Sequence, residues 1–122
     1  MSLKKQLIKN YLKMQLISSM PGELRIKVTN LPKLSQEYLE FAPYVYEFIK
    51  LKDGIKDVKA NFATGEVTIY YNSTMQPQEI IMWINTIMDV AIEQMDMIAD
   101  KWDANKEEVI NTLKRILIGK MF

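Results

Sequence analysis

The side chains that most often do chemistry in proteins are missing from this sequence of 122 residues, which contains neither cysteine nor histidine. These two residue types supply most nucleophiles, general bases and soft metal ligands. Their absence excludes zinc fingers, cysteine nucleophiles, disulfide scaffolds and histidine general bases. No paired carboxylates, no serine beside a base and no phosphate-binding loop stand out in the rest. We therefore expect a protein that is not an enzyme and uses no cofactor.

Methionine offers the remaining soft ligands, and nine methionines are present. Met95 and Met97 could bind copper(I) through their thioether sulfurs. Methionines at helical spacing usually fill gaps in a hydrophobic core instead, and Met82, Met88 and Met95 have that spacing. The sequence therefore predicts no metal site, with Met95 and Met97 as the weak candidates.

Three carboxylates near the carboxyl end, Asp96, Asp100 and Asp103, lie three or four residues apart. On one helix face they could gather a hard cation. A calcium loop also needs a glycine turn and alternating oxygen ligands, and both are missing here. We expect a solvated acidic face.

Aromatic side chains could line a ligand pocket or stack on nucleic-acid bases. The candidates are Tyr38, Tyr44, Tyr46, Tyr70, Tyr71, Trp83 and Trp102. If these aromatic residues bound RNA, Tyr70 would lie beside Lys59 and Arg25 on an open sheet face. The sequence lacks the glycine-aromatic signatures of RNA-recognition domains, and its net charge of +1 is too balanced for a nucleic-acid binder. We expect no nucleic-acid partner and aromatic packing beneath the terminal helices.

The elements that must position these residues begin with residues 1–19, which have the pattern of a basic amphipathic helix. Apolar residues recur at spacings of three and four, and Lys5, Lys9 and Lys13 fall on the opposite side. Such a helix packs on its domain or lies on an anionic membrane. We expect packing, with at most a weak contact to an anionic membrane surface.

A strand and a helix follow. Leu24, Ile26 and Val28 alternate with polar residues, which predicts a strand with one face toward a core. A helix start is expected at Ser35. Either this helix kinks at Pro43, or the regular helix begins at Pro43 and runs to Leu51, before Gly54.

A hairpin and two more helices complete the chain. Residues 55–62 and 66–72 read as strands joined by a tight turn at Gly65. A long helix begins near Pro77, and a last helix follows a cap at Asp103 or Asn105.

This order predicts an α+β protein with the β-α-β-β-α core of the ferredoxin-like fold. The sheet would have three or four antiparallel strands, with extra helices at both ends of the chain. Residues 95–103 are a poor fourth strand, because aspartates interrupt them and their apolar residues suit a helix. We expect one domain over residues 1–122: the helix of 1–19, a core of 20–95 and a helical extension of 96–122.

Two stretches within residues 20–95 resemble the heavy-metal-associated (HMA) domain. Residues 51–72 have that family's helix end, strand, Asn-x-x-Thr-Gly hairpin and strand at the same spacing. The matching positions are Gly54, Ile55, Val58, Asn61, Thr64, Gly65, Val67, Ile69 and Asn72. Residues 21–26 resemble the Pro-Gly-Arg-Leu-Arg opening of a divergent HMA-like branch.

The resemblance implies a lost metal site. Metal-carrying HMA domains place Cys-x-x-Cys between the first strand and the first helix, where two thiolates bind the ion. Residues 29–35 of this chain hold no thiolate, imidazole or carboxylate. The implied function is a noncatalytic interaction or regulatory module, associated with membrane metal-transport machinery. The alternative is a small-ligand or trace-metal carrier with ligands other than cysteine.

The chain has no apolar run long enough to span a bilayer and no signal-peptide pattern, so we expect a cytoplasmic location. With three strands, the one holding Leu24, Ile26 and Val28 would lie at a sheet edge and offer unpaired backbone groups. The expected partner is a protein or a second copy, in a homodimer through this edge or the terminal helices. A terminal helix over the edge would instead leave a monomer.

Overall fold

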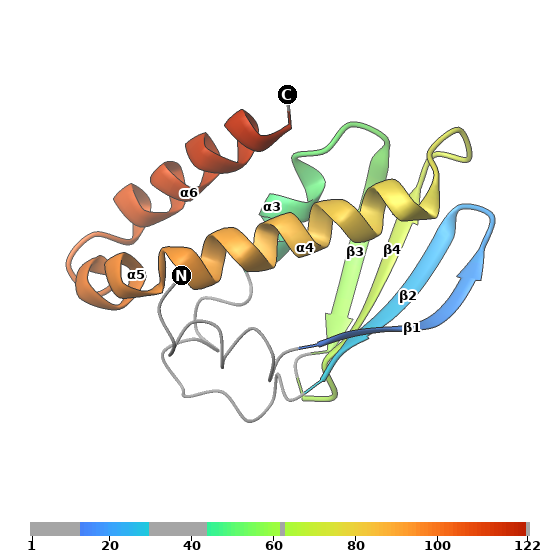
Figure 1. Cartoon of the computed structure of the whole chain (residues 1–122), viewed down its shortest axis with the longest axis horizontal. Coiled ribbons are helices and arrows are strands. Elements are labelled where there is room, and N and C mark those ends of the chain that lie inside the picture. The colour runs from blue at the N-terminus through green and yellow to red at the C-terminus, as the bar shows by residue number, and fades with distance from the viewer. Residues whose placement is uncertain (1–12, 30–43, 62, 122) are drawn as a thin grey trace.

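The computed structural model describes residues 13–29, 44–61 and 63–121. Its centre is one sheet of four antiparallel strands in the order β1-β2-β4-β3 (Figure 1). The strands are β1 (Met14–Met20), β2 (Glu23–Val28), β3 (Ile55–Asn61) and β4 (Glu66–Tyr71).

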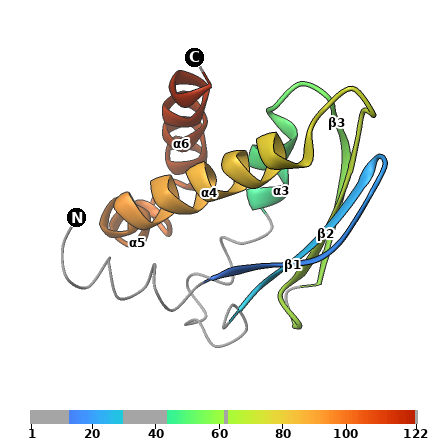
Figure 2. The same cartoon turned by 45° about the vertical axis from the view of Figure 1, so that its right-hand side comes forward.

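The described helices lie on one side of this sheet, as Figure 2 shows. They are α3 (Val45–Lys50), α4 (Pro77–Glu93), α5 (Met95–Lys101) and α6 (Lys106–Lys120). The α+β class is confirmed, and the sheet and helices are compatible with a ferredoxin-like arrangement.

The core forms between this helical layer and one face of the sheet. Leu24 pairs with Ile69 and Ile26 with Val67, so the alternating apolar residues of β2 and β4 share that face. All four are buried. The predicted alternation of β2 is confirmed, and its buried positions are those expected from the sequence.

The helix expected over residues 1–19 is wrong from Met14 onward, where the chain forms β1. β1 pairs with β2 through a two-residue turn at Pro21 and Gly22. Gly22 has a φ of +80°, and Pro-Gly with a positive φ at the glycine is typical of a type II turn. These two residues turn a hairpin rather than end a helix. Lys5 and Lys9 lie outside the described residues, and Lys13 directly precedes β1.

The expectation that β2 forms a sheet edge is also wrong. β2 pairs with β1 on one side and with β4 on the other. At its end, the Thr29 hydroxyl donates to the Lys13 carbonyl (3.0 Å) and accepts from the Lys13 backbone N–H (3.1 Å). Because β1 pairs with its backbone, β2 offers no edge to a partner. Leu24, Ile26 and Val28 are buried core residues.

The second hairpin is confirmed. The Gly65 and Thr64 N–H groups donate to the Asn61 carbonyl, at 2.8 and 3.2 Å, and Gly65 has the positive φ that the tight turn needs (+80°). The Asn61 side chain accepts from the Ala63 N–H at 3.0 Å. These bonds are local, which explains why the sequence alone predicted them.

The helices after the hairpin follow the expected pattern with one interruption, at Gln94, which separates α4 from α5. Met95–Lys101 is helical, as expected, and gives no fourth strand. Asn105 caps α6, since its side chain accepts from the Glu108 N–H at 3.1 Å. Glu47 on α3 forms an ion pair with Lys114 on α6 at 3.2 Å.

Candidate functional site

The two methionines considered as copper ligands are placed in the packing of α5. Met95 is only 4% exposed, and Met97 is partly buried against the core. Their burial fits a packing role. Within the residues that the structure describes, no group of three or more aspartate or glutamate side chains is arranged to hold a metal ion.

The three aspartates considered as a cation site are exposed. Asp96 and Asp100 lie on α5, and Asp103 follows it. Their positions fit the solvated acidic face that the sequence predicts.

The aromatic residues divide between the helical layer and the sheet, with Tyr38 outside the described residues. Tyr44 and Trp102 form an edge-to-face pair with ring centroids 5.4 Å apart, and the Lys106 ammonium lies 5.4 Å from the Trp102 ring centroid. Trp83 is buried, and its ring N–H lies 3.2 Å from the carbonyls of both Phe48 and Ile49. These contacts join helices to one another.

The open face of the sheet brings together two of the three residues considered as an RNA-binding surface, Lys59 and Tyr70. The Lys59 ammonium lies 5.6 Å from the ring centroid of Tyr70, a distance typical of a cation–π contact. Arg25 and Lys59 are both paired with Thr68 in the register of the sheet, from opposite sides. Lys59 and Tyr70 are therefore in contact, and Arg25 lies on the neighbouring strand of the same face.

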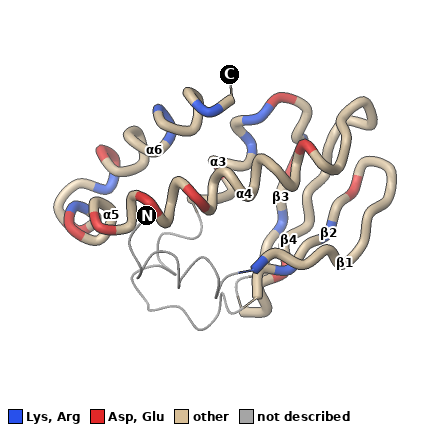
Figure 3. The backbone as a smooth tube through the Cα atoms, in the orientation of Figure 1, with Lys and Arg blue, Asp and Glu red and all other residues tan. Residues whose placement is uncertain are grey.

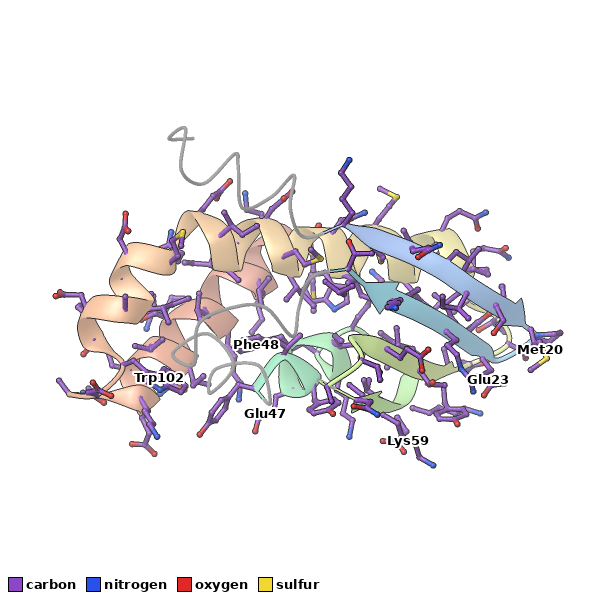
Figure 4. The ribbon with its side chains drawn as sticks, turned by 90° about the horizontal axis from the view of Figure 1, so that it is seen from below. Met20, Glu23, Glu47, Phe48, Lys59 and Trp102 are labelled. Carbon is purple, nitrogen blue, oxygen red and sulfur yellow. The ribbon has the colours of Figure 1, made fainter. Side chains whose placement is uncertain are left out.

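The charge of this face is mixed. Glu23 is paired with Tyr70, and Glu66 with Lys27, so this face carries acidic side chains beside Arg25, Lys27 and Lys59. Figure 4 shows Glu23 and Lys59 on the sheet, away from Phe48 in the core. A surface that binds the phosphate backbone needs an excess of positive charge, and this face is mixed.

Asp57 adds a further negative charge beside the same face. Its carboxylate accepts the Val58 backbone N–H at 2.9 Å and forms an ion pair with Lys50 at 3.3 Å. The backbone hydrogen bond, followed by the Lys50 contact, lowers the pKa of Asp57 below its ordinary value. Both contacts favour the ionised form of the carboxylate.

The two edge strands of the sheet differ in how they meet solvent. On β3, the Tyr46 hydroxyl donates to the Ala60 carbonyl at 2.9 Å and accepts from the Ala60 N–H at 3.1 Å. β3 also carries Lys56, Asp57 and Lys59. Charged residues and covered backbone groups are the usual protection of an edge strand, so the β3 edge is protected.

The β1 edge is less protected within the described part of the chain, where one side chain bonds to its backbone: the Tyr71 hydroxyl donates to the Met20 carbonyl at 3.3 Å. Between Met14 and Met20 it has no charged residue (Figure 3). Five large apolar side chains are exposed in the described residues, and three of them lie on β1: Leu16 (54%), Ile17 (44%) and Met20 (54%). This exposed edge, defined by those three residues, is the candidate site.

The hydrogen bonds around β2 show which backbone groups are free to bind. Thr29 donates its N–H to the Lys13 carbonyl at 2.8 Å, whereas Val28 donates to Gly65, on the β4 side, at 2.8 Å. Neighbouring residues of an antiparallel strand direct their groups alternately to its two sides. Alternate residues of β2 therefore bind β1, and the others bind β4.

The same alternation extends to β1. Leu16 and Ser19 are paired in register with Ile26 and Leu24, which direct their backbone groups to β4. Leu16 and Ser19 therefore direct their own N–H and carbonyl groups away from β2. A β-bulge lies between Leu16 and Ser18. The exposed edge thus combines apolar side chains with backbone donors and acceptors that no described strand pairs.

The sequence analysis missed this site because it assigned the segment to a helix. One signal pointed to it: Pro21-Gly22, a dipeptide typical of turns, stands between two apolar segments.

Comparison of the chain with protein-family models, curated proteins and solved structures gave no match. Among the described residues, no helix is both long enough and apolar enough to cross a membrane.

Proposed function

We propose that this protein is a noncatalytic, HMA-like interaction module that binds another polypeptide along β1. The observation that carries the proposal is the exposed edge, with its uncharged strand, three exposed apolar side chains and outward backbone groups. An extended peptide that adds to such an edge gains main-chain hydrogen bonds for affinity and side-chain contacts for specificity.

The arrangement of the elements supports an HMA-like relationship. β2, α3, β3, β4 and α4 follow one another in the β-α-β-β-α order of a ferredoxin-like core. β1 pairs with β2, the strand that opens this core, and so takes the position of the fourth strand. Under the proposal, a strand from the amino-terminal side replaces the one that usually follows the second helix.

The role follows from the missing thiolates. The chain has no cysteine or histidine to carry a soft metal ion, so an HMA-like domain of this kind acts by docking. We propose membrane metal-transport machinery as its setting, where it would be a regulatory or docking partner rather than a carrier.

A photo-crosslinking residue at position 17 tests the proposal. We expect benzoylphenylalanine in place of Ile17 to join the chain to one discrete partner in cells, because position 17 lies on the exposed edge. The matched control is the same residue in place of Ile118 on α6, an isoleucine of nearly equal exposure (46% against 44%). No adduct at position 17, or the same adducts at both positions, would contradict the proposal.

The alternative function, a trace-metal carrier, has a separate test. We expect the purified protein to bind no copper(I), zinc or cadmium more tightly than micromolar, because it lacks thiolates and imidazoles and Met95 is buried. Titration against a metal indicator measures this affinity. One equivalent of metal retained against a micromolar competitor would favour the carrier, and the Met95→Leu variant would then show whether Met95 is a ligand.

A further inference from the structure

We propose that the polypeptide bound along β1 is a second copy of this chain, with the two β1 strands antiparallel about a two-fold axis close to Ile17. This inference rests on the proposed function and names its partner. It predicts one continuous sheet of eight strands across the dimer. The edge of β2, which the sequence analysis chose for dimerisation, takes no part.

Backbone geometry makes β1 complementary to itself. Leu16 and Ser19 direct their N–H and carbonyl groups to the open side of the strand. A second β1 running in the opposite direction, with Leu16 of each copy opposite Ser19 of the other, presents the same donors and acceptors, so each copy satisfies groups that the other leaves open. A two-fold interface of this kind uses one surface twice, as most homodimers do.

The absence of charged residues on β1 favours a second copy of the strand over a charged partner. In an antiparallel pair about a two-fold axis, side chains near the axis lie close to their own counterparts in the other copy, so like charges there would repel each other. The residues Met14–Met20 carry no charge. An axis near Ile17 brings the exposed Leu16 and Ile17 side chains of both copies together, and their burial would drive the association.

The opposite edge of the sheet, β3, has features that prevent pairing with a second copy. Tyr46 occupies the backbone N–H and carbonyl of Ala60 on β3, and Lys56, Asp57 and Lys59 add charge along that strand. As far as residues 13–29, 44–61 and 63–121 show, the sheet thus has one protected edge and one edge with little protection. The difference restricts association to a closed pair and prevents an endless array of sheets.

The remaining exposed apolar residues make poorer interfaces. Met82 lies on α4 and Ile118 on α6, each without a second exposed large apolar side chain on its helix in the described residues. Single exposed apolar residues are normal on protein surfaces, and Ile118 therefore serves as the control position.

Light scattering behind a sizing column tests the dimer. We expect the full chain to elute with about twice the 14.3 kDa mass of one copy. The Ile17→Lys and Ile17→Glu variants should each be monomeric, with dimer dissociation constants raised by at least about 30-fold, because two like charges meet near the axis. The Ile118→Lys variant should remain a dimer.

A mixture of the two charged variants provides the rescue. The introduced lysine of one chain would then face the introduced glutamate of the other across the axis. An equimolar mixture of Ile17→Lys and Ile17→Glu should therefore recover the dimer, at low salt above all. Circular dichroism of each variant shows whether it is folded. Rescue also excludes misfolding as the cause of dissociation, because a misfolded chain would not regain the partner.

The outcomes separate this inference from the proposed function. A wild-type chain of 14.3 kDa across the micromolar range, with a crosslink from position 17 to a different protein, would overturn self-pairing and keep the interaction module. A monomer with no crosslink at position 17 would overturn both. A dimer that Ile118→Lys disrupts, or that neither Ile17 variant disrupts, would show that β1 is not the interface.

Discussion

Replacing Phe48 with alanine is expected to lower the free energy of unfolding by about 3–5 kcal/mol. Phe48 is 1% exposed and belongs to the core between α3, the sheet and α4. Alanine loses the burial of the ring and leaves a cavity that close-packed neighbours fill only in part. A domain of this size has a total stability of about 5–15 kcal/mol, so one substitution removes a large share.

Urea unfolding followed by circular dichroism measures this change, with two controls. Phe48→Leu keeps most of the volume and is expected to cost less than about 1.5 kcal/mol if the core repacks. Met82→Ala, at a side chain 68% exposed on α4, is expected to change stability by less than about 0.5 kcal/mol. Equal effects for Phe48→Ala and Met82→Ala would show that Phe48 is not in the core.

Deleting residues 1–18 is the second change with a large expected effect, since it removes most of β1. The strand supplies the hydrogen bonds on one side of β2, and Lys13, directly before it, accepts the Thr29 N–H. Without this segment, the backbone of β2 becomes an unprotected edge beside the buried Leu24 and Ile26. We expect a markedly lower melting temperature, or aggregation on purification.

A graded control separates the strand from its end contact. Thr29→Val removes the hydroxyl that bonds to Lys13 and keeps β1, so it should lower the free energy of unfolding by only about 0.5–1.5 kcal/mol.

Deletion of residues 1–18 also tests the expected weak contact with an anionic membrane surface. Binding of the full chain to acidic vesicles should be marginal and lost at high salt. An unchanged melting temperature, together with the loss of strong vesicle binding, would instead make this segment a membrane anchor.

The parts of the fold that the sequence determined by itself are those with local interactions. The turn between β3 and β4 is one example, because Asn61, Ala63 and Gly65 bond within a few residues of each other. The cap of α6 is another, where Asn105 accepts from Glu108 three residues later. The alternation of Leu24, Ile26 and Val28 also determined which face of β2 is buried. In the turn and the cap, the neighbours in sequence are the neighbours in space.

The identity of β1 was decided only by the tertiary structure. Met14, Leu16, Ile17 and Met20 have spacings that fit a helix face, and a strand of this kind is recognised only by its partner. A helix makes its backbone hydrogen bonds within its own segment, whereas a strand makes them with another segment. The local sequence pattern therefore does not distinguish a helix from a strand here; pairing with β2 determines that the segment is a strand.

The candidate site depended on the same decision. The absence of cysteine and histidine removed thiolate and imidazole ligands from consideration on the sequence alone and left Met95 and Met97 as weak candidates; the structure places Met95 in the interior. The open edge could not be predicted from the sequence, because the edge strands of a sheet are defined only by the order in which its strands pair. The sequence expected β2 there, and the structure places β1 there instead. Composition thus limited the chemistry, while pairing between strands determined which backbone groups remain free to bind.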